Sequence, residues 1–233
     1  MRRAGPYREP VTATDPARTD RHLLVMDVDS TFITAEVIEL LAERAGRKDE
    51  VAAVTEAAMR GELDFAASLE RRVATLAGLP VSVFEDVLAE VRLTPGAVEL
   101  LDVARSRGWA VGLVSGGFEE VVAPLAARHG ITRFRANRLE VREGALTGRT
   151  TGPVIDRSAK ERTLREFAEL EGIPMSRTVA IGDGANDLDM IGAAGVGIAF
   201  QAKPVVEAVA PYVVPGPRLD AAVAVIDAAI AAR

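Results

Sequence analysis

The chain has 233 residues, of which 48% are hydrophobic and 27% are charged, as in globular proteins that bury a full core. Its formal net charge of −6 and its aromatic content of 4% argue against a general nucleic-acid binder, which needs positive charge and stacking platforms. With no cysteine, the chain has neither disulfides nor thiolate metal sites. No apolar stretch is long enough to cross a bilayer and no secretory signal pattern follows the first residues, so we expect a cytoplasmic protein.

The first part of the chain predicts a tail, one strand and a helical insertion. Residues 1–22 have no hydrophobic periodicity, and we expect a disordered tail there. The solid apolar run at 23–26 stops abruptly at Asp27, which is typical of a strand buried on both faces. Residues 36–94 show only helical spacing, at 37–41, 52–59, 65–76 and 81–91. Because so small a helical unit would be marginal alone, we expect it to pack over a sheet as a cap.

The rest of the chain predicts an alternation of strands and helices. Strands are expected at 109–114, 178–181, 195–200 and 212–214. Helices are expected between them, at 97–107, 119–129, 159–171, 187–194, 204–210 and 220–232. This alternation indicates an α/β fold with a doubly wound parallel sheet. From 138 to 149, apolar and charged residues alternate on either side of Glu143 and Gly144, which predicts a β-hairpin.

Polar side chains follow three of the predicted strands where each strand ends. They are Asp27, Asp29 and Thr31, then Ser115, Gly116 and Gly117, then Asp183, Asn186 and Asp187. Ligands of open parallel sheets bind beyond the carboxyl ends of the strands, so we expect these residues to share one crevice, within reach of Lys160. Each motif alone has an ordinary explanation as a helix cap, a connecting loop or a surface lysine. Their joint occurrence at strand ends argues against coincidence.

The chemistry of this set points to phosphoryl transfer. Carboxylates without histidine or cysteine form a hard oxygen site, which suits Mg²⁺ shared with a phosphate. The metal, Lys160, the Ser115 hydroxyl and backbone N–H groups would supply the positive field that a phosphate needs. A carboxylate beside a metal can also attack phosphorus and form an aspartyl-phosphate.

At these motifs the sequence resembles the haloacid dehalogenase superfamily of phosphohydrolases, and within it the phosphoserine phosphatases. The motifs are Asp27-Val28-Asp29-Ser30-Thr31, Ser115-Gly116-Gly117-Phe118, Lys160 and Gly182-Asp183-Gly184-Ala185-Asn186-Asp187. The resemblance runs from residue 23 to 233. It implies a Rossmann-like catalytic core of residues 23–35 and 95–233, with a small all-helical cap of residues 36–94 inserted after the first strand.

The resemblance also implies a role for each motif residue. Asp27 is the nucleophile and a Mg²⁺ ligand, while Asp29 is the general acid and then the general base, its backbone carbonyl also binding the metal. Asp183 is a further metal ligand, which Asp187 supports through the metal's waters. The residues that hold the phosphate are Ser115, Gly116 through its N–H, Lys160 and Asn186.

Substrate selection is expected to lie in the cap. O-phosphoserine carries an ammonium, which needs an anion, and a carboxylate, which is best met by an arginine. Glu36 and Arg72 match the family's positions for these two jobs, and Met59 and Phe65 match the apolar residues that shield the pocket. Taken by their patterns alone, Glu36 is also a first-turn helix acid and Arg72 also a residue of a solvated helix face.

The resemblance therefore implies Mg²⁺-dependent hydrolysis of O-phosphoserine to serine and phosphate through an aspartyl-phosphate, the last step of serine biosynthesis. We expect a small-molecule substrate, no nucleic-acid or membrane partner, and a monomer or homodimer. One alternative is a phosphatase or phosphotransferase of the same fold that acts on another small phosphomonoester. A non-catalytic phosphate-binding domain is disfavoured because no motif carboxylate is missing. A nucleotide switch is disfavoured because the glycine-lysine-serine/threonine phosphate loop is absent.

Overall fold

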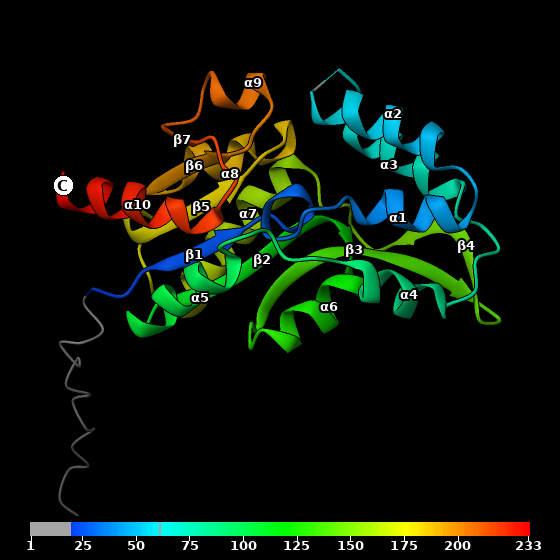
Figure 1. Cartoon of the computed structure of the whole chain (residues 1–233), viewed down its shortest axis with the longest axis horizontal. Helices are drawn as coiled ribbons and strands as arrows, with labels where there is room; N and C mark the ends of the chain where they lie inside the picture. Colours follow the sequence, from blue (N-terminus) through cyan, green and yellow to red (C-terminus); the bar gives the residue numbers. More distant parts are fainter. Residues whose placement is uncertain (1–19, 61) are drawn as a thin grey trace, which may run out of the picture.

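The protein is built around a seven-stranded sheet (Figure 1). The computed structural model describes residues 20–60 and 62–233, so all but the end of the predicted tail lies outside the described part. The strands are β1 (Leu23–Met26), β2 (Ala110–Phe118), β3 (Arg133–Arg142), β4 (Ala145–Thr151), β5 (Thr178–Gly182), β6 (Val196–Phe200) and β7 (Tyr212–Val214). Their order is β4-β3-β2-β1-β5-β6-β7, and every neighbouring pair is parallel except β3–β4.

Helices cover both faces of the sheet, which confirms the doubly wound α/β prediction. One face carries α5 (Ala97–Ser106), α6 (Glu119–Arg128) and α10 (Ala222–Ala231), and the other carries α7 (Arg157–Glu171) and α8 (Leu188–Ala193). Successive side chains of a strand point to opposite faces, so Leu24 and Met26 pack with the first group and Leu23 and Val25 with the second. The short elements are η2 (Val28–Phe32), η3 (Met175–Arg177), η4 (Ala185–Asp187), α9 (Pro204–Glu207) and η5 (Leu219–Ala221).

A helical cap follows β1, as predicted. It contains α1 (Val37–Arg44), α2 (Lys48–Met59), α3 (Phe65–Ala74) and α4 (Val83–Glu90), and α2 and α3 lie over one end of the sheet in Figure 1. Its two connections to the core pair with each other: Thr34 N–H donates to Arg92 O (3.0 Å) and Thr94 N–H donates to Phe32 O (3.0 Å). These bonds fix where the chain leaves and re-enters the core.

A second attachment joins the cap to the β3–β4 hairpin, far from these connections. Gly78 N–H donates to Leu146 O (2.8 Å), Leu146 N–H to Leu79 O (2.8 Å), and Val81 N–H to Gly144 O (3.0 Å). The segment between α3 and α4 therefore pairs with the free edge of β4, which blunts a sheet edge that would otherwise expose unpaired backbone groups.

The strands β2 and β3 differ most from their predicted bounds. The strand predicted to stop at Val114 continues to Phe118, although its pairing with β3 is irregular between these two residues. The predicted hairpin is also longer, because β3 begins at Arg133 and pairs with β2 there, so the hairpin is part of the main sheet. Arginines at the start of β3 interrupt the apolar pattern by which a strand is recognised in a sequence.

Within the described residues, no helix combines the length and the apolar character needed to span a bilayer.

Candidate active site

The end of β1 places two carboxylates on the same side of the sheet edge. Asp27 N–H donates to Ile181 O (2.9 Å), which holds the strand end beside β5. The chain then enters the tight turn η2, in which Ser30 has a left-handed backbone with φ 56°. Asp27 and Asp29 both have extended backbone, and both side chains line the hollow beyond the strands.

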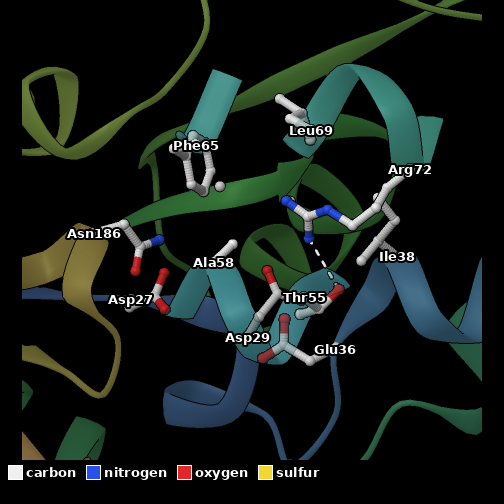
Figure 2. A pocket seen from close by; sticks show the side chains of 12 residues that line it. Asp27, Asp29, Glu36, Ile38, Thr55, Ala58, Phe65, Leu69, Arg72 and Asn186 are labelled. Carbon is white, nitrogen blue, oxygen red and sulfur yellow. Dashed lines mark hydrogen bonds between the residues drawn. The ribbon is translucent and has the colours of Figure 1, made fainter. Parts of the chain in front are cut away.

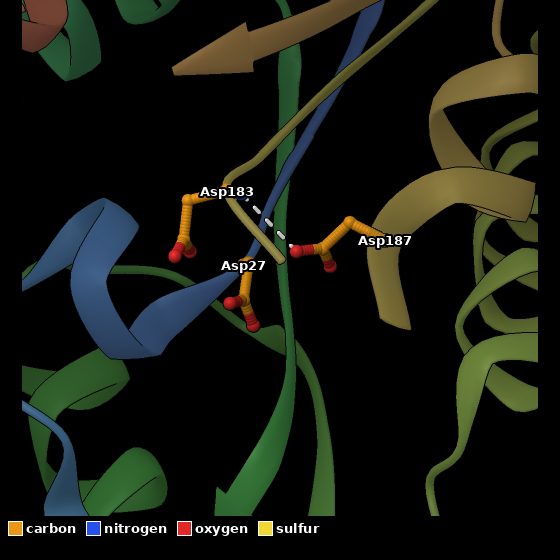
Figure 3. Close-up of side chains that lie close together, drawn as sticks. All are labelled: Asp27, Asp183 and Asp187. Atoms are coloured by element: carbon orange, nitrogen blue, oxygen red, sulfur yellow. Dashed lines mark hydrogen bonds between the residues drawn. The ribbon is translucent and has the colours of Figure 1, made fainter. Parts of the chain in front are cut away.

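Three aspartates, Asp27, Asp183 and Asp187, form a buried cluster at this edge (Figure 3), and a buried lysine contacts two of them. Lys160 Nζ, carried by α7, donates to Asp27 Oδ1 and to Asp187 Oδ1, both at 2.7 Å. Asp183 accepts a bond from Thr31 Oγ1 at 2.9 Å. Asp187 Oδ2 accepts bonds from the backbone N–H groups of Asp183 (3.2 Å) and Gly184 (3.0 Å). One oxygen from each of Asp27, Asp183 and Asp187 lies within 4.8 Å of the others.

The electrostatics of the cluster fit a divalent cation. Burial, together with repulsion from Asp187, raises the pKa of Asp27, and burial with repulsion from Asp27 raises the pKa of Asp183. Burial alone would lower the pKa of Lys160, but Asp187 and Asp27 outweigh it and raise that pKa. One lysine therefore does not neutralise the three carboxylates, and a hard cation with oxygen ligands would supply the missing charge. Asp27, Asp183 and Asp187 could hold such an ion.

Asp29 is held between the cap and the second motif. Its Oδ1 accepts from Val37 N–H at the start of α1 (2.8 Å), and its Oδ2 accepts from Ser115 Oγ (2.8 Å). Ser115 Oγ in turn accepts from Gly117 N–H (2.7 Å). Burial raises the pKa of Asp29 despite these bonds. A Cβ at Gly117 would lie 2.5 Å from Asp29 Oδ2, so a glycine is needed there.

Gly116 allows the cap to approach the core closely. A Cβ on Gly116 would lie 2.8 Å from Cζ of Phe65 and 3.5 Å from Nδ2 of Asn186.

Asn137, which the sequence analysis did not single out, holds the Gly116 backbone in place. Its Nδ2 donates to Gly116 O (2.8 Å) and its Oδ1 accepts from Ile155 N–H (2.8 Å). The sequence signal for it was weak, since one asparagine inside a charged strand is unremarkable.

Glu36 and Arg72 face the same cavity as the aspartates, from the cap side (Figure 2). Ser30 Oγ donates to Glu36 Oε1 at 2.6 Å. Burial of the carboxyl group, with repulsion from Asp29, raises the pKa of Glu36 to about 7. Arg72 is only 6% exposed, so it does not lie on a solvated helix face. The side chain of Met59 lies outside the described part of the structure.

The structure brings the predicted residues together around one cavity. Its lining includes Asp27, Asp29, Glu36, Phe65, Arg72, Gly116 and Asn186. Ser115 donates to Asp29 and Lys160 donates to Asp27, while Asp187 connects to Asp27 through the shared Lys160. Lining residues that the sequence analysis did not identify are Ile38, Thr55, Ala58 and Leu69. These belong to cap helices, whose inward faces depend on packing that helical periodicity does not specify.

The profile of the haloacid dehalogenase-like hydrolases matches residues 24–191. A phosphoserine phosphatase of Streptococcus thermophilus is 53% identical over 205 residues, which cover 88% of this chain and 95% of that protein. This chain belongs to the phosphoserine phosphatase family of those hydrolases. A phosphoserine phosphatase of Mycobacterium tuberculosis is 55% identical over 203 residues, which cover 87% of this chain; the chain spans about half that relative's length, 49%.

Two solved structures of the family superimpose on the fold. One is a substrate-bound phosphoserine phosphatase complex, with a TM-score of 0.85 and 38% identity, covering 87% of this chain and 97% of the other. The second is a phospho-aspartyl intermediate analogue of a phosphoserine phosphatase, with a TM-score of 0.85 and 38% identity, covering 88% and 98%. The family membership and the sheet with its cap agree with the sequence expectation.

Proposed function

We propose that this chain hydrolyses O-phosphoserine to serine and phosphate, with residues 23–35 and 95–233 as the catalytic core and residues 36–94 as the cap. The observation that carries this proposal is one cavity lined on the core side by Asp27, which belongs to the acidic cluster and contacts Lys160, and on the cap side by Glu36 and Arg72. The first set suits a phosphate and the second suits an amino acid. Phosphoserine joins these two groups in one small molecule.

Asp27 is the proposed nucleophile. Lys160 holds Oδ1, while no hydrogen bond in the described part of the chain engages Oδ2, so that oxygen can attack phosphorus. The Asp27–phosphorus bond forms as the bond to the serine oxygen breaks, and water then cleaves the aspartyl-phosphate. Ser115, the Gly116 N–H, Lys160 and Asn186 would hold the phosphoryl oxygens, which spreads the developing charge. A phospho-aspartyl analogue of a 38% identical relative supports this route.

Asp29 is the proposed general acid and base. It must donate a proton to the leaving serine oxygen and then accept one from the attacking water. Its raised pKa favours the protonated form needed first, and its contacts with Ser115 and Val37 keep the carboxyl group in place for both steps.

Mg²⁺ is the proposed metal, held by Asp27, Asp183 and the carbonyl of Asp29, with Asp187 behind them. When bound, it would neutralise phosphoryl charge and polarise the phosphorus centre. The donor set is all oxygen, which suits this hard cation.

Phosphate release tests the function directly. The substrates are O-phosphoserine, O-phosphothreonine, O-phosphoethanolamine and an unrelated monoester, each with and without Mg²⁺. We expect metal-dependent release with phosphoserine strongly preferred. Equal rates on all four would indicate a general phosphatase, and no release from any of them would indicate a binding domain.

A further inference from the structure

Arg72 is held by neutral groups alone among the residues that the structure describes. Its Nε donates to Ser68 O (3.1 Å), its Nη1 to Thr55 Oγ1 (3.0 Å), and its Nη2 to Ser68 Oγ (3.4 Å). Arg72 makes no ion pair within this part of the chain, although Glu36, Asp29 and Glu39 lie near enough to raise its pKa against the lowering by burial. The guanidinium is therefore oriented without being neutralised, and its charge is left for an anionic ligand.

Thr55 reaches Arg72 from a different helix. Thr55 lies on α2, whereas Arg72 and Ser68 both lie on α3. The hydrogen bond from Arg72 to Thr55 therefore fixes the position of the guanidinium relative to another element of the cavity wall. The Thr55 side chain is 2% exposed and lines the cavity itself (Figure 2). A helical threonine often returns its hydroxyl to a backbone carbonyl one turn earlier. Among the described residues, the Thr55 hydroxyl makes no such bond, and its one hydrogen bond is the one it accepts from Arg72.

We propose that Thr55 is a positioning and specificity residue for the substrate carboxylate. Its Oγ1 accepts from Nη1 and turns the guanidinium fork toward the cavity, where the fork can meet a carboxylate in a two-point contact. The inference rests on the proposed phosphoserine substrate and names a residue that selects it over carboxylate-free amines.

The first test replaces Thr55 by valine, which keeps the branched shape and removes the hydroxyl. KM and kcat are measured for O-phosphoserine and for O-phosphoethanolamine, which lacks the carboxylate. We expect the KM for phosphoserine to rise about tenfold, the value of one hydrogen bond to a charged group, with kcat changed little. The KM for phosphoethanolamine should stay the same, because that substrate presents nothing to Arg72.

Two further variants separate positioning from packing. Thr55→Ser keeps the hydroxyl and should retain most of the affinity for phosphoserine. Thr75→Val is the matched control, because Thr75 Oγ1 donates to the backbone carbonyl of Arg72 (2.6 Å) and does not touch the guanidinium. It should leave the discrimination between the two substrates unchanged.

The double variant Thr55→Val with Arg72→Ala gives the decisive comparison. If Thr55 acts through Arg72, adding Thr55→Val to Arg72→Ala raises the KM for phosphoserine no further. A rise in KM of the same size for both substrates in Thr55→Val, or no rise for either, overturns the proposal. If Thr55→Val does not fold, the comparison of Thr55→Ser with Thr55→Ala decides, and equal behaviour of those two variants also overturns it. A wild-type enzyme without preference for phosphoserine over phosphoethanolamine would instead refute the proposed substrate.

Discussion

Asp27 is the residue on which the proposed chemistry depends. Asp27→Asn keeps the shape and an oxygen for Lys160, but an amide oxygen is a poor nucleophile toward phosphorus. We expect turnover to fall by more than about 10³-fold, because a covalent step is removed. The thermal midpoint should be retained, since the change removes one negative charge from a crowded buried cluster. An Asp27→Asn protein with wild-type turnover would refute the assignment.

Glu36 predicts a pH dependence of substrate recognition. Its pKa is raised to about 7, so the carboxylate that would pair with the substrate ammonium is lost as the pH falls below that value. We expect kcat/KM for phosphoserine to fall on the acid side of neutrality, since this ratio reports ionisations of the free enzyme.

The control for Glu36 is 3-phosphoglycerate, in which a hydroxyl replaces the ammonium. The acid side of the kcat/KM–pH profile for 3-phosphoglycerate should not contain the Glu36 ionisation. In the profile for phosphoserine, Glu36→Gln should remove the fall in kcat/KM that this ionisation causes. Identical acid limbs for both substrates in the wild-type enzyme would contradict the role of Glu36.

Among single residues, the sequence predicted those that lie together because they follow the ends of neighbouring strands. Asp27, Ser115 and Asp183 could be grouped because parallel strands end at one edge of a sheet. Thr55 and Asn137 could not be found this way, because their roles depend on which helix face or strand side meets the cavity. That choice is made by packing between segments far apart in the chain.

Among the elements, α2 and the loop before α9 form a bridge between cap and core. Lys203 Nζ lies 2.9 Å from Glu56 Oε2 on α2, and Lys203 N–H donates to the carbonyl of Asp183 (3.0 Å). This ion pair links the cap to a segment that is hydrogen-bonded to Asp183, a member of the acidic cluster. It favours the arrangement in which the cap covers the cavity.

Lys203→Gln should therefore weaken substrate binding modestly. Both side chains are partly exposed, so the pair is worth up to about 1 kcal/mol, and we expect the KM for phosphoserine to rise by up to about fivefold. The difference from wild type should shrink in high salt, which screens exposed charges. Arg60→Gln is the control, because Arg60 pairs with the same Glu56 within the cap (3.2 Å). An equal effect of both variants would contradict the bridge.

The elements themselves were largely predictable, because buried parallel strands are solid apolar runs and helices are amphipathic. The strand at 212–214 has its predicted bounds, and the insertion after β1 is helical, as expected. Predictions failed where polarity hides a strand: the start of β3 carries Arg133 and Arg135. The pairing of residues 78–81 with β4 was also missed, since a backbone-to-backbone contact leaves no side-chain pattern.

For the whole molecule, the acidic cluster couples folding to metal and to pH. The pKa values of Asp27 and Asp183 are raised in the folded state, so without metal these groups favour folding at low pH, and that contribution is lost as the pH rises through the folded-state values. Metal binding needs ionised carboxylates. We therefore expect Mg²⁺ to raise the thermal midpoint, and to raise it more at pH 8 than at pH 5.

Thermal unfolding with a chelator and with added Mg²⁺ measures this effect. Asp183→Asn should abolish the shift, while Asp102→Asn, a change on the exposed surface of α5, should leave it intact. A midpoint that does not respond to Mg²⁺ at either pH would argue against the metal site.

The hydrogen bonds between Gly78–Val81 and β4 have a mechanical consequence. If the two connections at Thr34 and Thr94 were its only attachment, the cap could rotate about them as a rigid body. Because it is also hydrogen-bonded to the hairpin, it is held at two separate places. Movement of the cap away from the cavity must therefore either break the hydrogen bonds at Leu146 or bend the β3–β4 hairpin. A bent hairpin would favour return of the cap to its original position. Hydrogen exchange at the amides of Gly78, Val81 and Leu146 therefore measures how often the cap separates from the hairpin.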